Sequence, residues 1–281
     1  MNITEWIGRT KSDADVIGAT PCAALAATLD RPAQRPSPGT LLPALWHWLY
    51  FLPLSPEAEI GPDGHPRRGE FLPPLSLPRR MWAGSQIEFH KPLHVGDELT
   101  RISTIEDISE KSGHNGSLVF VKVRHEIRRR GETECALTER HDIVYRQAAT
   151  PGEVAPAAAP AATDETWSKK WVPDAVLLFR YSALTFNSHR IHYDRRYVTE
   201  VEGYAGLIVQ GPLIATLLLG LLRDHLPDAQ VSRFEFRALH PLFDMNHFFV
   251  CGKPLPDGKT FTLWCRNHEG ALSMEASAVI R

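Results

Sequence analysis

The segment TFNSHRIHYD, residues 185–194, carries one amide, two histidines, an arginine and an acid within ten residues. A histidine titrates close to neutrality and can take a proton from water, so His192 is a candidate general base. An amide such as that of Asn187 orients water through its carbonyl and NH₂ groups. Fewer than twenty residues later, Gly211 opens a helix-like run whose first N–H groups could stabilise negative charge on a carbonyl oxygen. These residue types predict addition of water to a conjugated thioester, or the reverse reaction.

Metal binding is a second interpretation of this segment, because His189 and His192 are three residues apart. His247 and His268 could complete a set of ligands from elsewhere in the chain. However, the amide of Asn187 is a poor metal ligand, and no Glu occupies the position that an H-E-x-x-H helix requires. We therefore predict no metal ion.

A solvated turn is the third interpretation, and it accounts well for Ser188, His189 and Arg190. It accounts less well for the neighbourhood, because the segment follows the apolar run VLLFRYSALTF (176–186), which we expect to point into a core. Polar groups between two core elements must be paired or functional, since an unsatisfied buried polar group costs about 1–3 kcal/mol. This argument favours a functional site over a turn.

Two runs predict the buried helices that would position such a site. GPLIATLLLGLLRDHLP (211–227) has Pro212 in its first turn and Leu or Ile on nearly every face, so it must be buried. GATPCAALAATLDRP (18–32) predicts a smaller buried helix in the first half of the chain. Strand-like segments follow each helix, with period-two alternation at IEF (87–89) and FEF (234–236). Each half therefore predicts a helix followed by antiparallel strands.

A curved sheet wrapped around the helix is the physical solution for that pattern, so the predicted fold class is α+β. The stretch QAATPGEVAPAAAPAATD (147–164) is rich in Pro, Ala and small polar residues without apolar periodicity, which is typical of an exposed linker. We therefore predict an N-terminal domain over 1–146, a linker over 147–168 and a C-terminal catalytic domain over 169–281.

The composition argues against several classes of function. A formal net charge of -2 leaves no excess of positive charge for a nucleic-acid backbone, so we expect no nucleic-acid partner. The four cysteines include no C-x-x-C pair, which indicates reduced thiols. The start MNITEWIGRTKSD lacks the pattern of a secretory signal, and no stretch approaches the ~18 apolar residues that span a bilayer. We expect a soluble, cytoplasmic protein without membrane contact.

The run YSALTFNSHRIHYDRRYVTEVEGYAGLIVQGPL (181–213) resembles the MaoC-like enoyl-CoA hydratase family. The family signature runs roughly F-S-x-x-S-G-D-x-N-P-x-H, followed by a G-(F/Y) turn and an H-G-(M/P)-L helix start. Tyr181 and Ser182 match the opening of the signature, and His192 matches the catalytic histidine. Gly211 matches the glycine whose amide serves as oxyanion donor.

The chain departs from this signature at several positions. Asn187 stands where the family has a catalytic aspartate, His189 and Arg190 replace an Asn-Pro pair, and Gln210 replaces the histidine before the glycine. Because an amide can only orient water, the resemblance implies that His192 carries most of the base character. The same positions match a divergent two-domain subgroup with the run S-A-(L/V)-T-(F/W)-N-x-H-x-I-H-Y-D. That subgroup includes mesaconyl-C4-CoA (3-methylfumaryl-CoA) hydratase, itaconyl-CoA hydratase and the mitochondrial 3-hydroxyacyl-thioester dehydratase.

The resemblance covers nearly the whole chain and implies a double hot-dog fold, with two buried helices each wrapped by an antiparallel sheet. It implies reversible hydration of a 2-enoyl-CoA to a 3-hydroxyacyl-CoA without a cofactor. Asn187 would orient water, His192 would take its proton, and the Gly211 amide would polarise the thioester carbonyl. The first half has no Asn-x₄-His segment before its helix, so we expect one active site per chain and an N-terminal half that shapes the acyl pocket. We also expect a homodimer or larger homo-oligomer.

A C5 dicarboxylic substrate, such as mesaconyl-C4-CoA or itaconyl-CoA, needs a cation for its free carboxylate, and the fork of arginine binds both oxygens. The candidates for substrate binding are Arg190, Arg195, Arg233, Arg237 and Tyr181, with Arg79 and Arg80 for the CoA phosphates. We interpret Asp194 as the cap of a following turn. Two alternatives stay open, a non-catalytic acyl-thioester binding module and a thioesterase of the same fold.

Overall fold

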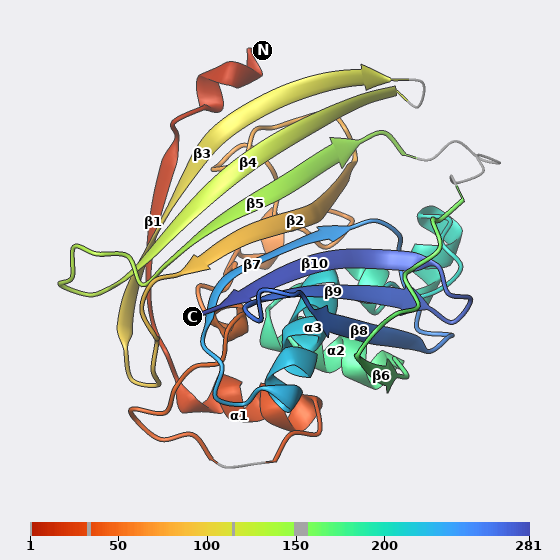
Figure 1. Cartoon of the computed structure of the whole chain (residues 1–281). Helices are drawn as coiled ribbons and strands as arrows, with labels where there is room; N and C mark the ends of the chain where they lie inside the picture. The colour runs from red at the N-terminus through yellow and green to blue at the C-terminus, as the bar shows by residue number, and fades with distance from the viewer. Residues whose placement is uncertain (1, 33–34, 114–115, 149–156) are drawn as a thin grey trace. The chain divides into compact units, whose positions relative to one another are not determined.

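The computed structural model describes residues 2–32, 35–113, 116–148 and 157–281 (Figure 1). The chain forms two compact units. Unit 1 comprises Met1–Ala83, Ile87–Ala148 and Tyr181–His189, and unit 2 comprises Gly84–Gln86, Ala149–Arg180 and Arg190–Arg281. Residues 149–156 of the predicted linker lie outside the described residues. The chemistry-bearing segment 185–194 is divided between the two units at residues 189 and 190.

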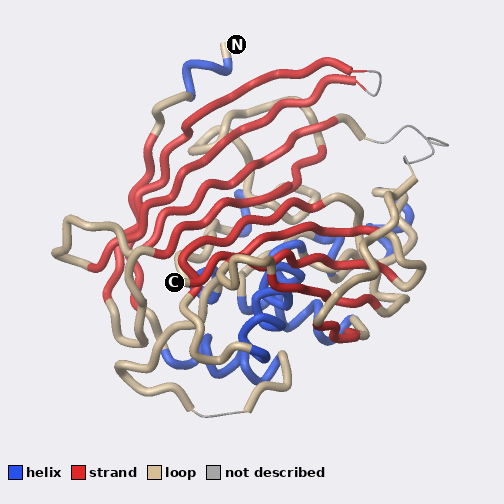
Figure 2. The backbone as a smooth tube through the Cα atoms, in the orientation of Figure 1, coloured by secondary structure: helices blue, strands red, loops and turns tan. Residues whose placement is uncertain are grey.

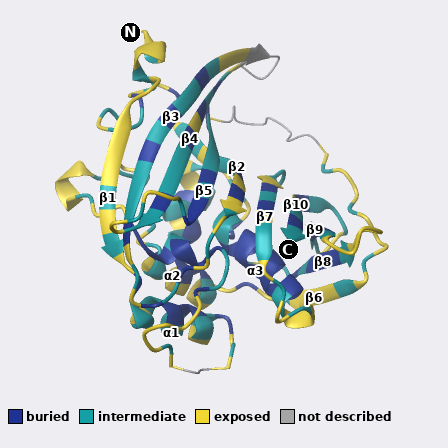
Figure 3. Cartoon of the chain, turned by 60° about the vertical axis from the view of Figure 1, so that its left-hand side comes forward, coloured by how far each residue is buried: buried dark blue, intermediate teal, exposed yellow. Residues whose placement is uncertain are grey.

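Unit 1 is built on long strands in the order β1-β3-β4-β5-β2, and the pairs β1–β3, β3–β4 and β4–β5 are antiparallel. The strands are β1 (Thr10–Val16), β2 (Arg79–Phe89), β3 (Glu98–Gly113), β4 (Gly116–Arg129) and β5 (Leu137–Arg146). Alternation along β4 turns Val119, Val121 and Val123 into the core, as a strand with one covered face requires. β1 is the first strand in this order, and most of its residues are exposed (Figure 3).

Helix α1 of unit 1 spans Ala19–Thr28, within the run predicted to form the smaller helix. It buries Cys22 and Leu25, whereas the other residues of the helix are partly or fully exposed. The hydroxyl of Tyr50 donates to the carbonyl oxygen of Gly18 over 2.6 Å, and the Sγ of Cys22 lies 3.0 Å from the same hydroxyl. These contacts fix the first turn of α1 on the residue that follows the short 3₁₀ helix η2 (Trp46–Leu49).

Unit 2 is built on strands in the order β7-β10-β9-β8-β6, with every neighbouring pair antiparallel. The strands are β6 (Trp167–Trp171), β7 (Val231–Ala238), β8 (Phe248–Pro254), β9 (Thr260–Asn267) and β10 (Leu272–Ile280). Helix α3 (Gly211–His225) packs against β8, β9 and β10 (Figure 2). Every residue from Leu213 to Leu222 is buried, which confirms the predicted enclosed helix. Even so, no helix in the described part of the chain is long and apolar enough to cross a membrane.

The run 176–186 forms most of helix α2 (Ala175–Leu184), and its apolar residues do not all point into a core. Leu178 and Tyr181, three residues apart on one face, are buried. Val176 and Phe179 lie on another face and are 60% and 63% exposed. The expectation that the whole run points inward was therefore wrong, because a helix on the surface of a unit buries only one stripe.

Candidate functional site

Helix α2 ends in a left-handed turn that sets the position of Asn187. The N–H of Asn187 donates to the carbonyl oxygen of Ser182 over 2.8 Å, and the N–H of Phe186 donates to that of Ala183 over 3.3 Å. This pair of bonds forms a Schellman motif, which needs a residue with positive φ just after the helix. Phe186 supplies it with a φ of 49°, a conformation that glycine adopts with less strain.

The side chain of Asn187 folds back onto its own segment. Its Oδ1 atom accepts a hydrogen bond from the N–H of His189 over 3.1 Å. An amide oxygen has two lone pairs, so this bond leaves capacity for a second donor such as water. The turn therefore fixes the direction of the amide that the sequence predicts to orient water.

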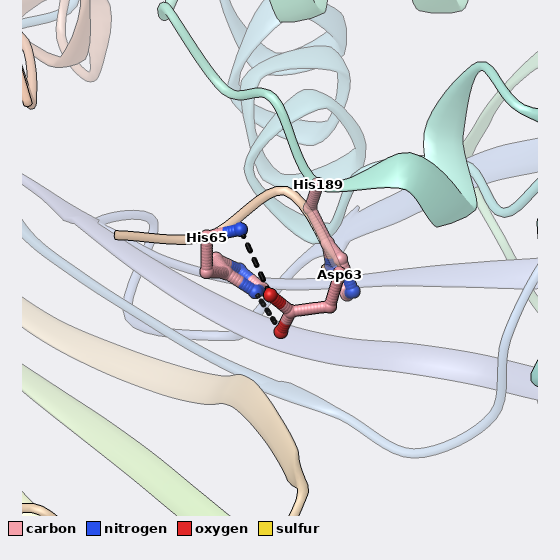
Figure 4. Close-up of side chains that lie close together, drawn as sticks. All are labelled: Asp63, His65 and His189. Atoms are coloured by element: carbon pink, nitrogen blue, oxygen red, sulfur yellow. Dashed lines mark hydrogen bonds and ion pairs between the residues drawn. The ribbon is translucent and has the colours of Figure 1, made fainter. Parts of the chain in front are cut away.

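A loop of unit 1 contacts the same segment at two neighbouring residues. The Ser188 hydroxyl donates to the carbonyl oxygen of Gly64 over 2.5 Å, and the ring of His189 lies 4.0 Å from the ring of His65, centroid to centroid. Asp63 holds His65 in place, since its Oδ2 atom lies 2.9 Å from Nδ1 of the ring and its Oδ1 accepts the backbone N–H over 3.0 Å (Figure 4). The loop therefore presents an acid–imidazole pair to the segment that carries Asn187.

The environment of this pair shifts both of its pKa values. Burial is the largest influence on the pKa of His65 and lowers it, the charge of Arg80 lowers it further, and Asp63 acts in the opposite direction. Burial acts to raise the pKa of Asp63, but the hydrogen bond and charge of His65 outweigh it and hold that pKa well below its usual range. Near neutral pH the pair is therefore a carboxylate beside a neutral imidazole.

This loop, GPDGHP (61–66), was not predicted to contact the segment of Asn187. Ser188 and Gly64 are 124 positions apart, so the local pattern of neither segment predicts their contact. A weaker signal was present, because an aspartate among glycines and prolines is typical of a tight turn in which its carboxylate accepts the backbone N–H two residues later.

In unit 2, His192 is buried and its ring is fixed by the backbone. Nδ1 of His192 lies 2.7 Å from the carbonyl oxygen of Ile208. Because a carbonyl oxygen can only accept, Nδ1 carries the proton and Nε2 of the neutral ring carries the lone pair. The N–H of Ile208 in turn donates to the carbonyl oxygen of Ile191 over 3.0 Å. The carbonyl of Ile208, three residues before the start of α3, therefore fixes the ring of His192.

Helix α3 begins at Gly211, which is preceded by Gln210 and followed by Pro212. Gln210 is buried, and its Nε2 atom donates to the carbonyl oxygen of Leu178 over 2.9 Å. As the first residue of the helix, Gly211 has an N–H without an intrahelical partner, at the positive end of the helix dipole. A Cβ atom placed at Gly211 would meet Met274 Cε at 4.0 Å and no nearer described atom. The start of α3 thus has space at the Cα of Gly211 and an N–H outside the helix's own hydrogen bonds.

The four arginines predicted to bind substrate each pair with a carboxylate of this chain. The pairs are Arg190 with Asp194, Arg195 with Asp244, Arg233 with Glu235 and Arg237 with Glu275. Tyr181, the fifth candidate, is buried. Asp194 also accepts the N–H of Tyr197 over 3.0 Å, so it caps the following helical turn as interpreted from the sequence.

The cluster of potential metal ligands in the described residues is Asp63, His65 and His189, whose ligand atoms lie within 4.8 Å of one another. It is not the set considered from the sequence, in which His189 and His192 would act with residues such as His247. The rings of His65 and His189 are tilted at an interplanar angle of 38°. Nδ1 of His65 is already hydrogen-bonded to Asp63 Oδ2, and this bond favours an acid–imidazole pair.

The sequence was compared with protein families and with known proteins. The model of a family described as hydroxyacyl-thioester dehydratase type 2 matches residues 45–244. The mesaconyl-C(4)-CoA hydratase of Chloroflexus aurantiacus is 44% identical over 275 residues, which cover 97% of this chain and 95% of that protein. The mitochondrial hydroxyacyl-thioester dehydratase type 2 of Schizosaccharomyces pombe is 29% identical over 232 residues, which cover 73% of this chain and 76% of that protein.

Solved structures share the fold at low sequence identity. A MaoC-like dehydratase matches with a TM-score of 0.73 and 16% identity, covering 99% of both chains. HtdX of Mycobacterium tuberculosis matches with a TM-score of 0.67 and 18% identity, covering 96% of this chain and 99% of its own. The predicted α+β hot-dog fold is thereby confirmed.

Proposed function

The chain belongs to the hydroxyacyl-thioester dehydratase type 2 family, and we propose that this hydro-lyase adds water reversibly to a 2-enoyl-CoA thioester to give a 3-hydroxyacyl-CoA. The observation that carries the proposal is the 44% identity to a mesaconyl-C(4)-CoA hydratase over 97% of the chain. The proposed substrate is accordingly a C5 dicarboxylic thioester, mesaconyl-C4-CoA or itaconyl-CoA.

Three residues carry the proposed chemistry. Asn187 orients the attacking water, His192 takes its proton, and the Gly211 amide polarises the thioester carbonyl as negative charge develops on its oxygen. The bond from His192 Nδ1 to the Ile208 carbonyl supports the first proton transfer, because it leaves the Nε2 lone pair as the base. The place of Gly211 as first residue of α3 supports its role as donor.

The free carboxylate of the proposed substrate requires a cation. Arg190, Arg195, Arg233 and Arg237 remain the proposed partners, with Tyr181 as a further contact. Arg190 is the leading member of this set, because it lies two residues before His192 and its guanidinium faces the ring of Tyr197 at 4.2 Å. The substrate carboxylate would replace Asp194 as the partner of Arg190.

A panel of thioesters tests the proposal directly. Purified protein is incubated with crotonyl-CoA, itaconyl-CoA and mesaconyl-C4-CoA, and mass spectrometry follows the gain of one water molecule. We expect turnover to be highest with a C5 dicarboxylic thioester. Tight binding without any mass change would instead support a non-catalytic binding module, and release of free CoA thiol would support a thioesterase.

The proposal includes a cytoplasmic location and a homodimer or larger assembly. Exposed apolar side chains of unit 2 support the assembly, since Val172, Val176 and Phe179 are each more than half exposed on the single chain. Sedimentation equilibrium measures the mass of the assembly, and a monomer at micromolar concentration would contradict the proposed homodimer or larger homo-oligomer.

A further inference from the structure

The proposed base, His192, can accept a proton at Nε2 only while its own proton stays on Nδ1. The carbonyl oxygen of Ile208 holds that proton over 2.7 Å, so the position of this carbonyl decides which nitrogen of the ring can react. A residue that holds Ile208 in place would therefore act on catalysis through His192, a role that rests on the proposed hydration. All of the residues concerned belong to unit 2.

The direction of the Ile208 carbonyl is set by the loop between β7 and β8. The N–H of Val209, which belongs to the same peptide group as this carbonyl, donates to the carbonyl oxygen of Leu242 over 2.9 Å. In a trans peptide the C=O and N–H groups point in opposite directions, so the bond made by Val209 turns the Ile208 carbonyl away from Leu242. On that other side the carbonyl meets Nδ1 of His192. The loop therefore controls the orientation of the imidazole through a single peptide group.

The carboxylate of Asp244, in this loop, binds both segments that the His192–Ile208 bond joins. Its side chain is only 6% exposed. The Oδ1 atom of Asp244 accepts the N–H of Leu207 over 2.9 Å, and its backbone N–H donates to the carbonyl oxygen of Leu207 over 3.0 Å. The Oδ2 atom pairs with the guanidinium of Arg195, three residues after His192. One buried carboxylate thus connects the segment before α3 to the segment of the proposed base.

Gly206 leaves the space that this carboxylate occupies. A Cβ atom at position 206 would lie 2.9 Å from Oδ1 of Asp244 and 3.2 Å from Cε of Met245. The first of these distances is too short for a carbon atom that is not bonded to the oxygen. Because the same Oδ1 atom binds the N–H of Leu207, the carboxylate would have to give up this bond to make room. The glycine therefore permits the close approach of the carboxylate to the backbone.

Unit 1 repeats the backbone pairing, but its aspartate binds different groups. Before α1, the N–H of Ile17 donates to the carbonyl oxygen of Asp97 over 3.0 Å, and the N–H of Gly96 donates to that of Ile17 over 2.8 Å. The Asp97 carboxylate accepts the N–H of His94 and the Nε of Arg129, both over 2.9 Å. The backbone bonds are therefore a feature of the fold in both halves. The bond from a carboxylate to the segment before the helix belongs to the half that carries the proposed base.

We propose that Asp244 is a positioning residue for His192. Its carboxylate fixes Leu207 and with it the neighbouring Ile208 carbonyl, which keeps the proton of His192 on Nδ1 and the lone pair on Nε2. Without the carboxylate, the segment before α3 keeps its backbone bonds to the loop but loses its bond to Oδ1. A shift of about 1 Å in the ring is enough to slow a reaction that depends on its position. Asp244 acts through the backbone and not on the thioester.

Three variants separate the two bonds of this carboxylate. Asp244→Asn keeps an oxygen for the N–H of Leu207 but loses the ion pair with Arg195, whereas Asp244→Ala loses both. Gly206→Ala displaces the carboxylate from the N–H while its charge stays. With mesaconyl-C4-CoA, Asp244→Ala and Gly206→Ala lower kcat about 10–10²-fold and change KM less than about threefold. Asp244→Asn stays within about fivefold of the wild-type kcat, because a partly exposed ion pair contributes little. The double variant of Gly206 and Asp244 to alanine is no slower than the slower single variant, since both changes remove one bond.

The tautomer of His192 gives a second measurement, which does not depend on activity. In protein made with isotope-labelled histidine, the Cδ2 chemical shift distinguishes Nδ1–H from Nε2–H at about pH 8.5, where histidine is neutral. Comparison with His192→Gln assigns the signal. We expect Nδ1–H in the wild type and in Asp244→Asn, and both tautomers in Asp244→Ala. The control is Asp257→Ala, which removes a carboxylate that accepts the N–H of Thr260 over 2.8 Å in the turn between β8 and β9. It keeps the wild-type kcat and the wild-type signal.

Thermal unfolding of each variant separates a loss of stability from a loss of positioning. Lower stability of Asp244→Ala with the wild-type kcat and a single Nδ1–H signal would mean a purely structural role and would overturn the inference. Equal losses of kcat in the asparagine and alanine variants would also overturn it, because the bond to Leu207 would then not be the one that matters. If Asp244→Ala does not fold, Gly206→Ala carries the same test. A wild-type protein that hydrates no thioester would overturn the proposed function, and the tautomer measurement would still decide whether Asp244 positions the ring.

Discussion

The carbonyl oxygen of Ile208 accepts a hydrogen bond from Nδ1 of His192 over 2.7 Å, so the backbone selects the ring nitrogen that can act as a base. Replacement of His192 by Ala should lower kcat by about 10²–10⁴-fold with a smaller change in KM, because base catalysis is lost while the thioester still binds. His225 is a matched control, since its Nδ1 also bonds a backbone carbonyl, that of Leu221, over 3.0 Å. His225→Ala should keep the wild-type kcat, and an unchanged rate in the His192 variant would refute the assignment.

Asn187 can be tested by separating its hydrogen-bonding capacity from its volume. Asn187→Asp keeps a side-chain oxygen that can accept hydrogen bonds from the N–H of His189 and from water. This variant should therefore retain hydratase activity. Asn187→Leu has similar volume and no polar atom, and misplacement of water should lower kcat by about 10²-fold. Stopped-flow absorbance of the enoyl thioester measures both rates. Equal losses in the two variants would contradict a role in orienting water.

The positive φ of Phe186 predicts an unusual order of stability. At this position glycine should be more stable than alanine by about 1 kcal/mol, because the left-handed conformation strains any residue with a Cβ atom. The same pair of substitutions at Phe179, an exposed position inside α2, should give the opposite order by about the same amount. Urea unfolding of the four variants measures both differences. Glycine less stable than alanine at position 186 would contradict the left-handed helix end.

The fold was largely predictable because the apolar residues of the chain recur with the period of its secondary structure. Helix α3 is apolar on nearly every face, and strands β4 and β7 alternate between apolar and polar residues, so these three elements could be predicted from the sequence. β1 and β6 were not predicted, because each is the last strand at an end of the strand order, short and largely polar, and carries little alternation.

The candidate site was predictable only where its residues are near neighbours in sequence. His192 and Gly211 were proposed from their chemistry, their short spacing and a family resemblance, and their roles stay a prediction. The contact of the loop of Asp63 and His65 with Ser188 was not predicted, because a contact over more than a hundred residues is created by tertiary packing and leaves no local spacing to detect. The arginines were selected for their charge, and the ion pair that each one makes, such as Arg195 with Asp244, depends on the same packing.

Arg190 can be tested as the partner of the substrate carboxylate by comparing two thioesters. Arg190→Gln should raise KM for mesaconyl-C4-CoA about tenfold, since one charge-assisted hydrogen bond is worth about 1.5 kcal/mol or more. Crotonyl-CoA lacks the carboxylate, so its KM should change little. Arg196→Gln, which removes an exposed pair with Glu200, is the control. An equal effect on both thioesters would show that Arg190 supports the fold and not the recognition of the carboxylate.

Glu139 is the most deeply buried acid of unit 1, and its charge should make stability depend on pH. It accepts hydrogen bonds from Nε2 of His47 over 2.9 Å and from Nε1 of Trp48 over 3.1 Å. Burial acts to raise its pKa, but the charge of His141 and the hydrogen bonds from both histidines outweigh burial and hold the pKa well below 4.5. Because the folded pKa is depressed, this stabilisation is fully present above the unfolded pKa and is lost as pH falls through the folded pKa.

Replacement of Glu139 by Gln should therefore destabilise the protein by about 3 kcal/mol near pH 7, the order expected when a buried ion pair loses one partner. The difference in the free energy of unfolding between the wild type and Glu139→Gln should become smaller below about pH 4.5, because the unfolded wild-type chain then binds a proton that the folded state does not. Glu98→Gln breaks an exposed pair with Arg130 and should change stability by less than about 0.5 kcal/mol at every pH. Urea unfolding across this pH range measures the free energy of unfolding of the wild type and of both variants. A destabilisation by Glu139→Gln that does not depend on pH would mean that Glu139 acts through packing and not through its charge.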